Sequence, residues 1–487
     1  MTRRWLFADQ LGPHFLDEPD QPVLLVESRR VFARRRFHRQ KAHLVLSALR
    51  HRAAELGDQA VFVQDDGYGP AVRAQRERVS VCHPTTRPAL RLVQELGVEV
   101  LPARGFATEQ QQFARWAGGH GSLLMEAFYR DARRRLGVLM EPDGPVGGTW
   151  NYDHDNREPP PADGLHLDEP WWPEEDEIDE QVRADLDRWE REGTARFVGR
   201  DGPRRFAATR AEALAALDHF VERRLPTFGP TEDAMLRRDW TMSHSLLSAT
   251  MNLGLLDPME CVRRAEAAYR SGAAPLASVE GYVRQLIGWR DYVYGTYWWF
   301  GPDYPGANAL GATTPLPDWF RELDADAVEA ACLRDVLAGV RDRGWVHHIP
   351  RLMVLGNYAL QRGWSPQELT AWFHECFVDG YEWVMVANII GMSQHADGGA
   401  MATKPYASGG AYINRMSDYC KPCAYDPKVR VGPTACPFTA GYWAFLDRTQ
   451  PLLAANPRMS RPLLGLARLS DREALVEQER ARGSAPP

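Results

Sequence analysis

The hydrophobic pattern changes once along this chain of 487 residues, and the change limits the folds that the chain can adopt. In the first part, short apolar runs alternate with amphipathic stretches, and we expect strands at residues 5–8, 23–27, 60–64 and 98–101. One segment between them, residues 41–56, has the leucine spacing of a helix. Strands that are separated by helices pair in parallel through right-handed crossovers. This part is therefore predicted to be an α/β domain with a Rossmann-like parallel sheet.

From Thr209 onwards the pattern is helical almost to the end. Residues 213–225 place their leucines on one apolar stripe, and no strand-like alternation of comparable length follows residue 210. The segment before Thr209 is rich in proline and carboxylates, which is typical of a connector. We therefore predict an α/β domain over residues 1–135, a connector over 136–208 and an all-α domain over 209–487. Residues 470–487 are expected to form a charged tail.

Composition and short motifs exclude several classes of protein. The net charge of −7 argues against a protein that coats nucleic acid through its overall charge, although a local basic patch would suffice to bind DNA. Neither G-x-G-x-x-G after the first strand nor G-x-x-x-x-G-K-[ST] occurs, so the common dinucleotide and phosphate-loop signatures are absent. No apolar run approaches the roughly 18 residues of a membrane span, and the first residues lack the apolar core of a signal peptide. We expect a soluble cytoplasmic protein.

Three of the seven cysteines lie close together in the sequence. Cys420 and Cys423 form a C-x-x-C motif, and Cys436 follows with a proline directly after it. Two thiolates separated by two residues can grip one metal centre, and a third can close from a nearby loop. The candidates for a fourth ligand are Cys82, Cys261, Cys332 and Cys376. Zinc and a 4Fe–4S cluster both stay open, with the spacing mildly favouring iron–sulfur; the alternative is a set of unrelated buried thiols.

The helical part is rich in tryptophan, since eight of the 16 tryptophans fall between Trp289 and Trp383. Such residues commonly fill the core of a large helical domain. A second interpretation is that some of them relay electrons to or from a buried redox centre, which a metal cluster nearby would favour.

Two polar groups interrupt the apolar segments of this part. His347 and His348 lie shortly before Arg351, and Asp379 follows further along the chain. A buried arginine needs a carboxylate partner, so we expect Arg351 and Asp379 to pair. The pair is either structural or flanks a flavin ring, where fixed positive charge stabilises a reduced anion. The histidines are either proton donors or core residues whose ring nitrogens are hydrogen-bonded.

Further stretches complete the pattern. They are DQL at 9–11, SHSLLS at 243–248, NLGLLDP at 252–258, QLIGWRD at 285–291, HHIPRLM at 347–353, AWF at 371–373, GMSQ at 391–394, KPY at 404–406 and YINRMS at 412–417. Together with the cysteines, they resemble the photolyase/cryptochrome superfamily, and in particular its bacterial iron–sulfur group, which contains (6-4) photolyases. The match extends nearly from end to end and is most specific in residues 240–440.

The resemblance implies an N-terminal antenna domain and a helical domain that holds FAD in a folded conformation. It implies that the four ligands of a 4Fe–4S cluster are Cys332, Cys420, Cys423 and Cys436. It assigns the FAD phosphates to Ser243, Ser245 and Ser248, the flavin pocket to Gln285, Trp289, Arg290 and Asn388, and the ion pair beside the flavin to Arg351 and Asp379. Trp372 resembles the first electron donor to the flavin, His347 and His348 resemble the histidines that face a DNA lesion, and Tyr406 and Tyr412 fall in the stretch that lines the lesion pocket.

The antenna region departs from the family pattern. In this group the antenna is typically a ribityl-lumazine, held partly by an acidic residue and a tyrosine after the second strand. Here residues 29–35 read RRVFARR and contain neither residue, although His38, Gln40 and Lys41 match. The sequence therefore leaves the identity of the antenna open.

The resemblance implies light-driven repair of ultraviolet-damaged DNA by a monomeric photolyase. Splitting a bonded pyrimidine pair needs one electron, which no side chain supplies, so reduced FAD must deliver it. The lesion must leave the base stack to reach the flavin. A (6-4) product also needs a proton donor, and His348 and His347 meet that need, which favours (6-4) repair over cyclobutane dimer repair. The alternatives are a cryptochrome-type photoreceptor without repair and a zinc-dependent nucleic-acid-binding protein.

Overall fold

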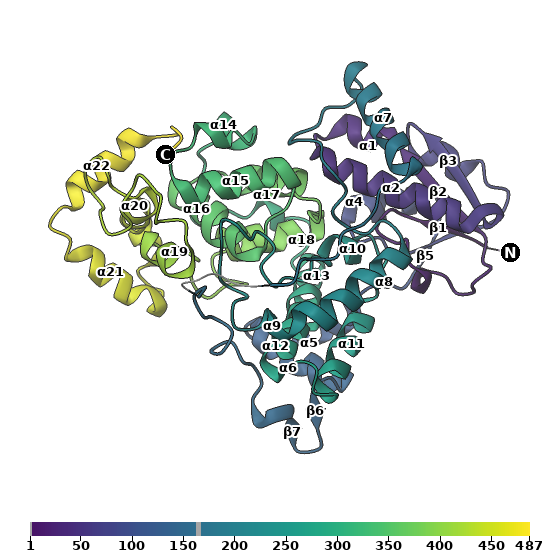
Figure 1. The fold of residues 1–487 in the computed structure, drawn as a ribbon, viewed down its shortest axis with the longest axis horizontal. Coiled ribbons are helices and arrows are strands. Elements are labelled where there is room, and N and C mark those ends of the chain that lie inside the picture. The colour runs from purple at the N-terminus through teal and green to yellow at the C-terminus, as the bar shows by residue number, and fades with distance from the viewer. Residues whose placement is uncertain (1, 162–166) are drawn as a thin grey trace.

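The computed structural model describes residues 2–161 and 167–487. It begins with a five-stranded sheet in the order β3–β2–β1–β4–β5, in which every pairing is parallel. The strands are β1 Arg3–Leu6, β2 Val23–Ser28, β3 Ala60–Asp65, β4 Val79–Cys82 and β5 Glu99–Leu101, and the helices between them are α1 Arg29–Arg34, α2 Arg39–Leu56, α3 Tyr68–Arg73 and α4 Arg87–Glu95. This confirms the predicted parallel α/β domain, which lies at one end of the molecule in Figure 1.

Two strands differ from the prediction. β1 begins at Arg3 rather than Trp5, because the Arg4 side chain is buried and donates to the Asp17 carboxylate at 2.6 Å. β4 was not predicted, since it is only four residues long and carries Ser80 between its two valines. Each of the two strands therefore contains a buried polar side chain, Arg4 in β1 and Ser80 in β4. Arg4 donates a hydrogen bond to the Ser80 hydroxyl, which takes the place of hydrogen bonds to water.

The rest of the described chain is helical, as predicted, apart from the short hairpin β6 Met140–Glu141 and β7 Gly144–Pro145. Its helices are α5 Gln110–Gly118, α6 Met125–Leu136, α7 Glu177–Arg191, α8 Arg210–His219, α9 Leu225–Phe228, α10 Ser248–Asn252, α11 Pro258–Arg270, α12 Leu276–Val283, α13 Asp291–Trp299, α14 Asp318–Arg321, α15 Ala331–Arg343, α16 Asn357–Arg362, α17 Pro366–Cys376, α18 Glu382–Val386, α19 Gly410–Met416, α20 Pro437–Leu453, α21 Ser460–Ala467 and α22 Arg472–Arg482. No helix of the described residues is both long and apolar enough to cross a membrane.

Helices α5 and α6 pack with the helical part and not with the sheet. Phe113 and Phe128 share a buried aromatic cluster with Tyr292 of α13. A side chain at Gly295 would meet the Phe113 ring at 2.1 Å, so only glycine allows this close approach. Helix α5 packs against α13, and α6 packs against the segment Arg284–Arg290. The helical core therefore recruits residues that precede the predicted boundary at residue 135.

The connector also contains regular structure. Helix α7 packs its Val182, Leu186 and Trp189 against α2 of the sheet domain. After α7, the buried guanidinium of Arg204 pairs with Asp179 of α7 at 3.0 Å and with Glu212 of α8 at 2.7 Å. Arg204 therefore fastens the connector to both flanking parts of the chain.

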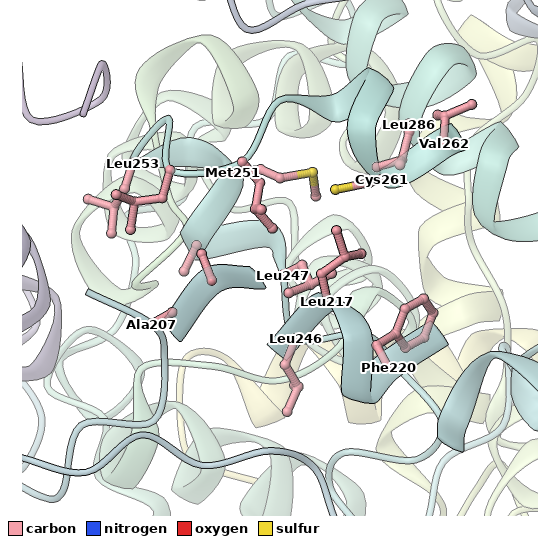
Figure 2. Close-up of a cluster of buried hydrophobic side chains, with 14 of the residues drawn as sticks. Ala207, Leu217, Phe220, Leu246, Leu247, Met251, Leu253, Cys261, Val262 and Leu286 are labelled. Carbon is pink, nitrogen blue, oxygen red and sulfur yellow. The ribbon is translucent and has the colours of Figure 1, made fainter. Parts of the chain in front are cut away.

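A hydrophobic cluster surrounds the segment that leads into α10 (Figure 2). Leu247, Met251 and Leu253 pack among α8, α11 and the turn that follows α12. These apolar side chains are buried on one side of residues 243–253. Polar side chains of the same segment, such as Ser248 and Asn252, face the opposite side. The core thus orients the polar groups described below.

Four helical segments contain π-type turns, in which the backbone accommodates one extra residue. They are Phe220–Arg224, Arg284–Arg290, Pro350–Gly356 and Ala387–Ser393. Turns of this type are rare and recur at functional sites. Three of the four carry predicted cofactor residues, namely Gln285, Trp289 and Arg290 on the second, Arg351 on the third and Asn388 on the fourth.

The prediction of a charged tail over residues 470–487 is wrong. Residues 472–482 form α22, which buries Leu475 and Glu479. Arg362 donates to the Glu479 carboxylate at 2.6 Å, and the Pro487 carbonyl accepts from two backbone amides that precede α15. Further charges of the segment are paired within the fold, Asp471 with Arg430 and Arg472 with Asp447, which its composition did not reveal.

We predict that Arg204→Met lowers the free energy of unfolding by about 3–5 kcal/mol, because it leaves the buried Asp179 carboxylate without its main partner. The control is Arg188→Met, whose half-exposed pair with Asp185 contributes about 0–1 kcal/mol. Urea unfolding followed by circular dichroism measures both variants. Equal shifts in the two would show that Arg204 does not hold the connector.

Candidate functional site

The carboxylate of Asp379 is the centre of a buried hydrogen-bond network. Arg351 donates to it through both terminal nitrogens, at 2.9 and 3.0 Å, as the sequence predicted. The Ser248 hydroxyl donates to the same carboxylate at 2.6 Å, and the Asn252 amide donates to the Asp379 backbone carbonyl at 2.9 Å. The loop before α18 is therefore joined to α10 and to the π turn that carries Arg351. Ser248 acts here by bracing Asp379.

Arg290 is a buried cation that lacks a carboxylate partner among the described residues. Its guanidinium lies between the rings of Phe106 and Trp383, at 5.1 and 5.0 Å, and donates to the Asn252 side chain at 2.5 Å. Its Nε is buried and has no hydrogen-bond partner within the described chain. Burial lowers the pKa of Arg290 to about 10, which still leaves it charged at neutral pH. Such a group is suited to an anion or an electron-rich ring.

Ser245 lines a small cavity together with Thr250, Arg205 and Arg224. Burial lowers the pKa of both arginines, and the Nε of Arg205 has no partner in the described residues. The rest of the lining is mainly apolar, including Trp171, Phe206 and Phe220, and the cavity of about 10 Å³ holds no more than a water molecule. Ser243 does not line it; its hydroxyl is 3.3 Å from that of Thr227.

The other predicted flavin-pocket residues lie on the same π turns. Gln285 and Trp289 are partly buried, and Trp289 packs with the aromatic cluster of α13. The amide of Asn388 donates to the Val384 carbonyl at 2.9 Å. These contacts place the three residues near Arg290 and α18, but no hydrogen bond joins them to Asp379 in the described chain.

Trp372 lies one ring away from the ion pair. Its ring centroid is 5.9 Å from that of Phe377, and the Phe377 ring lies 4.3 Å from the Arg351 guanidinium. On its other side Trp372 contacts Phe320 at 4.5 Å, and its indole N–H is buried without a partner in the described residues. An oxidisable ring therefore lies close to Arg351, deep in the helical core.

His347 and His348 meet a third histidine that the sequence did not single out. The His244 ring stacks on His347 at 4.4 Å and lies edge-on to His348 at 5.4 Å. His347 is buried, whereas the His348 side chain is 48% exposed and its Nε2 lies 3.4 Å from an Asp233 carboxylate oxygen. The motif around His244 offered a signal, but Asp233 lies outside every motif that the sequence showed.

Tyr406 and Tyr412 are partly buried beside this histidine cluster. Asp233 and Arg157 are near enough to both phenols to influence their pKa values. Burial is the main effect, and it raises the pKa of Tyr412 to about 12, so the phenol stays protonated. Two aromatic rings, an exposed imidazole and a carboxylate therefore meet at one place.

Cys332, Cys420, Cys423 and Cys436 line one small cavity, so the structure brings the distant Cys332 to the three clustered cysteines. The pKa of Cys332 is raised, first by burial and then by the three neighbouring thiols. All seven cysteines are free of disulfides.

The spacing of these sulfur atoms bears on the choice of metal. A single tetrahedral zinc needs sulfur atoms only about 3.8 Å apart, because each Zn–S bond is about 2.3 Å. Among the described residues, no three of the cysteine sulfurs fall within 4.8 Å of one another. Small side-chain movements would bring them to zinc distances, so this spacing does not decide between zinc and a multi-iron cluster.

The residues that match an antenna site make other contacts. His38 pairs through Nε2 with the Arg341 carbonyl at 3.1 Å, and Gln40 donates to the Asp342 carbonyl at 2.7 Å. Lys41 donates to the His374 carbonyl at 2.6 Å and to the Gly380 carbonyl, and burial lowers its pKa to about 7. These side chains tie α2 to the helical part.

The fold and the sequence are both similar to known proteins. The structure resembles a bacterial class III photolyase from Agrobacterium tumefaciens, with a TM-score of 0.57 and 13% identity over 93% of this chain and 98% of that one. It also resembles a Synechocystis cryptochrome, with a TM-score of 0.59 and 13% identity over 99% of this chain and 98% of that one. The fold is therefore that of the photolyases and cryptochromes.

Sequence similarity defines the family. Residues 4–193 match the family model of deoxyribodipyrimidine photo-lyase-related proteins. The chain is 38% identical to a (6-4) photolyase of Agrobacterium fabrum over 96% of its own length and 95% of that protein. It therefore belongs to the photolyase/cryptochrome superfamily, as the motifs predicted.

We predict that Cys332→Ser removes most of the iron from the purified protein and lowers its soluble yield, because a metal site of this kind is coupled to folding. The control is Cys82→Ser, since Cys82 lies on β4 away from the other thiols. Iron, sulfide and zinc analysis measures both variants. Zinc in the parent, or parental iron content in the variant, would contradict the ligand assignment.

Proposed function

We propose that this protein is a DNA photolyase that repairs (6-4) pyrimidine photoproducts under light. The observation that carries the proposal is the position of His347 and His348 on the same turn as Arg351, beside the Asp379 network. The near full-length similarity to a (6-4) photolyase supports it. Its substrate is ultraviolet-damaged DNA with the lesion flipped out of the duplex.

Members of this superfamily use FAD, and the residues present fit it. The Arg351 and Asp379 pair offers fixed positive charge beside a flavin ring, and Arg290 lacks an anionic partner within the described chain. Ser245 and Arg205 offer polar groups for a pyrophosphate, and the Arg205 Nε has no partner within the described chain. When bound, reduced FAD supplies the electron for repair on absorbing light. Asp379 is held in place by Ser248, Asn252 and Arg351.

His348 is the proposed proton donor to the lesion. His347 and His244 have pKa values well below the usual range, mainly because they are buried, and both are therefore neutral. His348 is exposed, and its Nε2 lies 3.4 Å from the Asp233 carboxylate. The proton moves from the His348 ring to the heteroatom that returns to its original base. Tyr406 and Tyr412 supply aromatic surface for the flipped bases.

The four cysteines are proposed to hold a 4Fe–4S cluster, which their common cavity and the proline directly after Cys436 support. A ribityl-lumazine antenna has no such support, because His38, Gln40 and Lys41 already bind backbone carbonyls of the helical part.

We predict that His348→Ala reduces (6-4) repair about 10²–10⁴-fold, the usual effect of removing a general acid. FAD content and photoreduction should stay at the parental level, because the flavin is held mainly by other residues. The measurement is repair of oligonucleotides with a defined (6-4) or cyclobutane lesion under blue light. The control is His154→Ala, whose side chain is fully exposed.

Other outcomes point to other functions. Parental (6-4) repair by His348→Ala together with loss in His347→Ala would exchange the roles of the two histidines. Repair of cyclobutane dimers alone would define a different photolyase. Absence of any repair by the FAD-loaded parent would favour a cryptochrome-type photoreceptor, the function named for one structural relative.

We predict that Trp372→Phe slows blue-light photoreduction of the flavin while FAD stays bound. Phenylalanine keeps most of the ring volume beside Phe377 and Phe320 but is much harder to oxidise. Absorbance under illumination with an external reductant measures the rate. Trp189→Phe is the control, because Trp189 packs between α7 and α2. An unchanged rate in the Trp372 variant would mean that another residue reduces the flavin.

A further inference from the structure

The histidine cluster has the composition of a metal site. One ring nitrogen from each of His244, His347 and His348 lies within 4.8 Å of the other two. A tetrahedral zinc ion with Zn–N bonds of about 2.0–2.1 Å needs nitrogens about 3.4 Å apart. Movements of about 1 Å would therefore close the site, and the exposed side chain of His348 is free to make them.

Two of these imidazoles have unused nitrogens. Nε2 of His244 and Nδ1 of His347 are buried, and neither has a hydrogen-bond partner among the described residues. A buried polar atom without a partner costs free energy that a ligand would recover. Burial also holds both rings in the neutral form, which is the form that coordinates metals.

Charged groups face the cluster from several elements. The Asp233 carboxylate lies 3.4 Å from Nε2 of His348 and brings a negative charge to this side of the cluster. Arg351 and Arg224 are near enough to lower the pKa values of the buried histidines, and their positive charge opposes a cation. Arg351 is neutralised by Asp379, whereas Arg224 donates to backbone carbonyls. The net environment permits a cation but limits its affinity.

We propose that His244, His347 and His348 bind one divalent transition-metal ion of the class that prefers imidazole, such as zinc. The site is separate from the four cysteines. The effect of this metal on repair rests on the proposed function. A metal on the His348 ring occupies the lone pair that must carry the donated proton, so binding inhibits repair.

Equilibrium dialysis of the FAD-loaded protein against zinc chloride, in the dark and without DNA, tests the site directly. The parent should bind one equivalent more than His348→Ala and His244→Ala, whose affinity at this site should fall at least tenfold. His154→Ala, which removes an exposed imidazole elsewhere, should bind like the parent. Iron is measured in the same samples. An unchanged iron content shows that the cysteines still hold iron, so that the added zinc is not bound there.

The outcomes are distinct. Equal zinc content in the parent and in His348→Ala would overturn the site, and this comparison stands even if His244→Ala fails to fold. If the parent binds the extra zinc, its (6-4) repair should fall as zinc is added and recover with a chelator. Repair that proceeds undiminished with zinc bound would overturn the inhibition. Extra zinc in a protein that never repairs DNA would keep the site and refute the proposed function instead.

Discussion

The arrangement of this molecule depends on the ion pair and hydrogen bonds of the buried Asp379 carboxylate. Taking a carboxylate and a guanidinium out of water costs several kcal/mol per ion, and good geometry with additional hydrogen bonds is needed to offset it. Arg351 provides the two-point contact, and Ser248 provides a further hydrogen bond. Lys41 of the sheet domain donates to the carbonyl of the next residue, Gly380. One turn thereby joins the sheet domain, α10 and the central helices.

The π turns explain how polar groups reach the middle of a helical core. A regular helix repeats its apolar face every three to four residues, so a polar residue on that face would be buried without partners. An inserted residue shifts the register and redirects one side chain. Arg290 and Arg351 both lie on such turns, and both guanidinium groups meet partners from other elements. The irregular geometry is therefore part of the site.

The two clusters of metal-ligating residues differ in spacing and surroundings. The four cysteine sulfurs line a common cavity. The histidine nitrogens are close together, and one of their rings is open to solvent beside Asp233. An enclosed thiol site suits a permanent centre, whereas an open imidazole site suits reversible binding and proton transfer.

The sequence alone determined the features that depend on local pattern or on chemical necessity. The parallel strands follow from their apolar runs, the C-x-x-C motif keeps Cys420 and Cys423 beside one cavity, and Arg351 needed a carboxylate that Asp379 supplies. Tertiary structure decided the rest. The contact of His244 and Asp233 with His348, the docking of Lys41 at Gly380 and the folding of α22 all join residues far apart in the chain. Such contacts depend on the path of the whole backbone, which spacing within one segment does not encode.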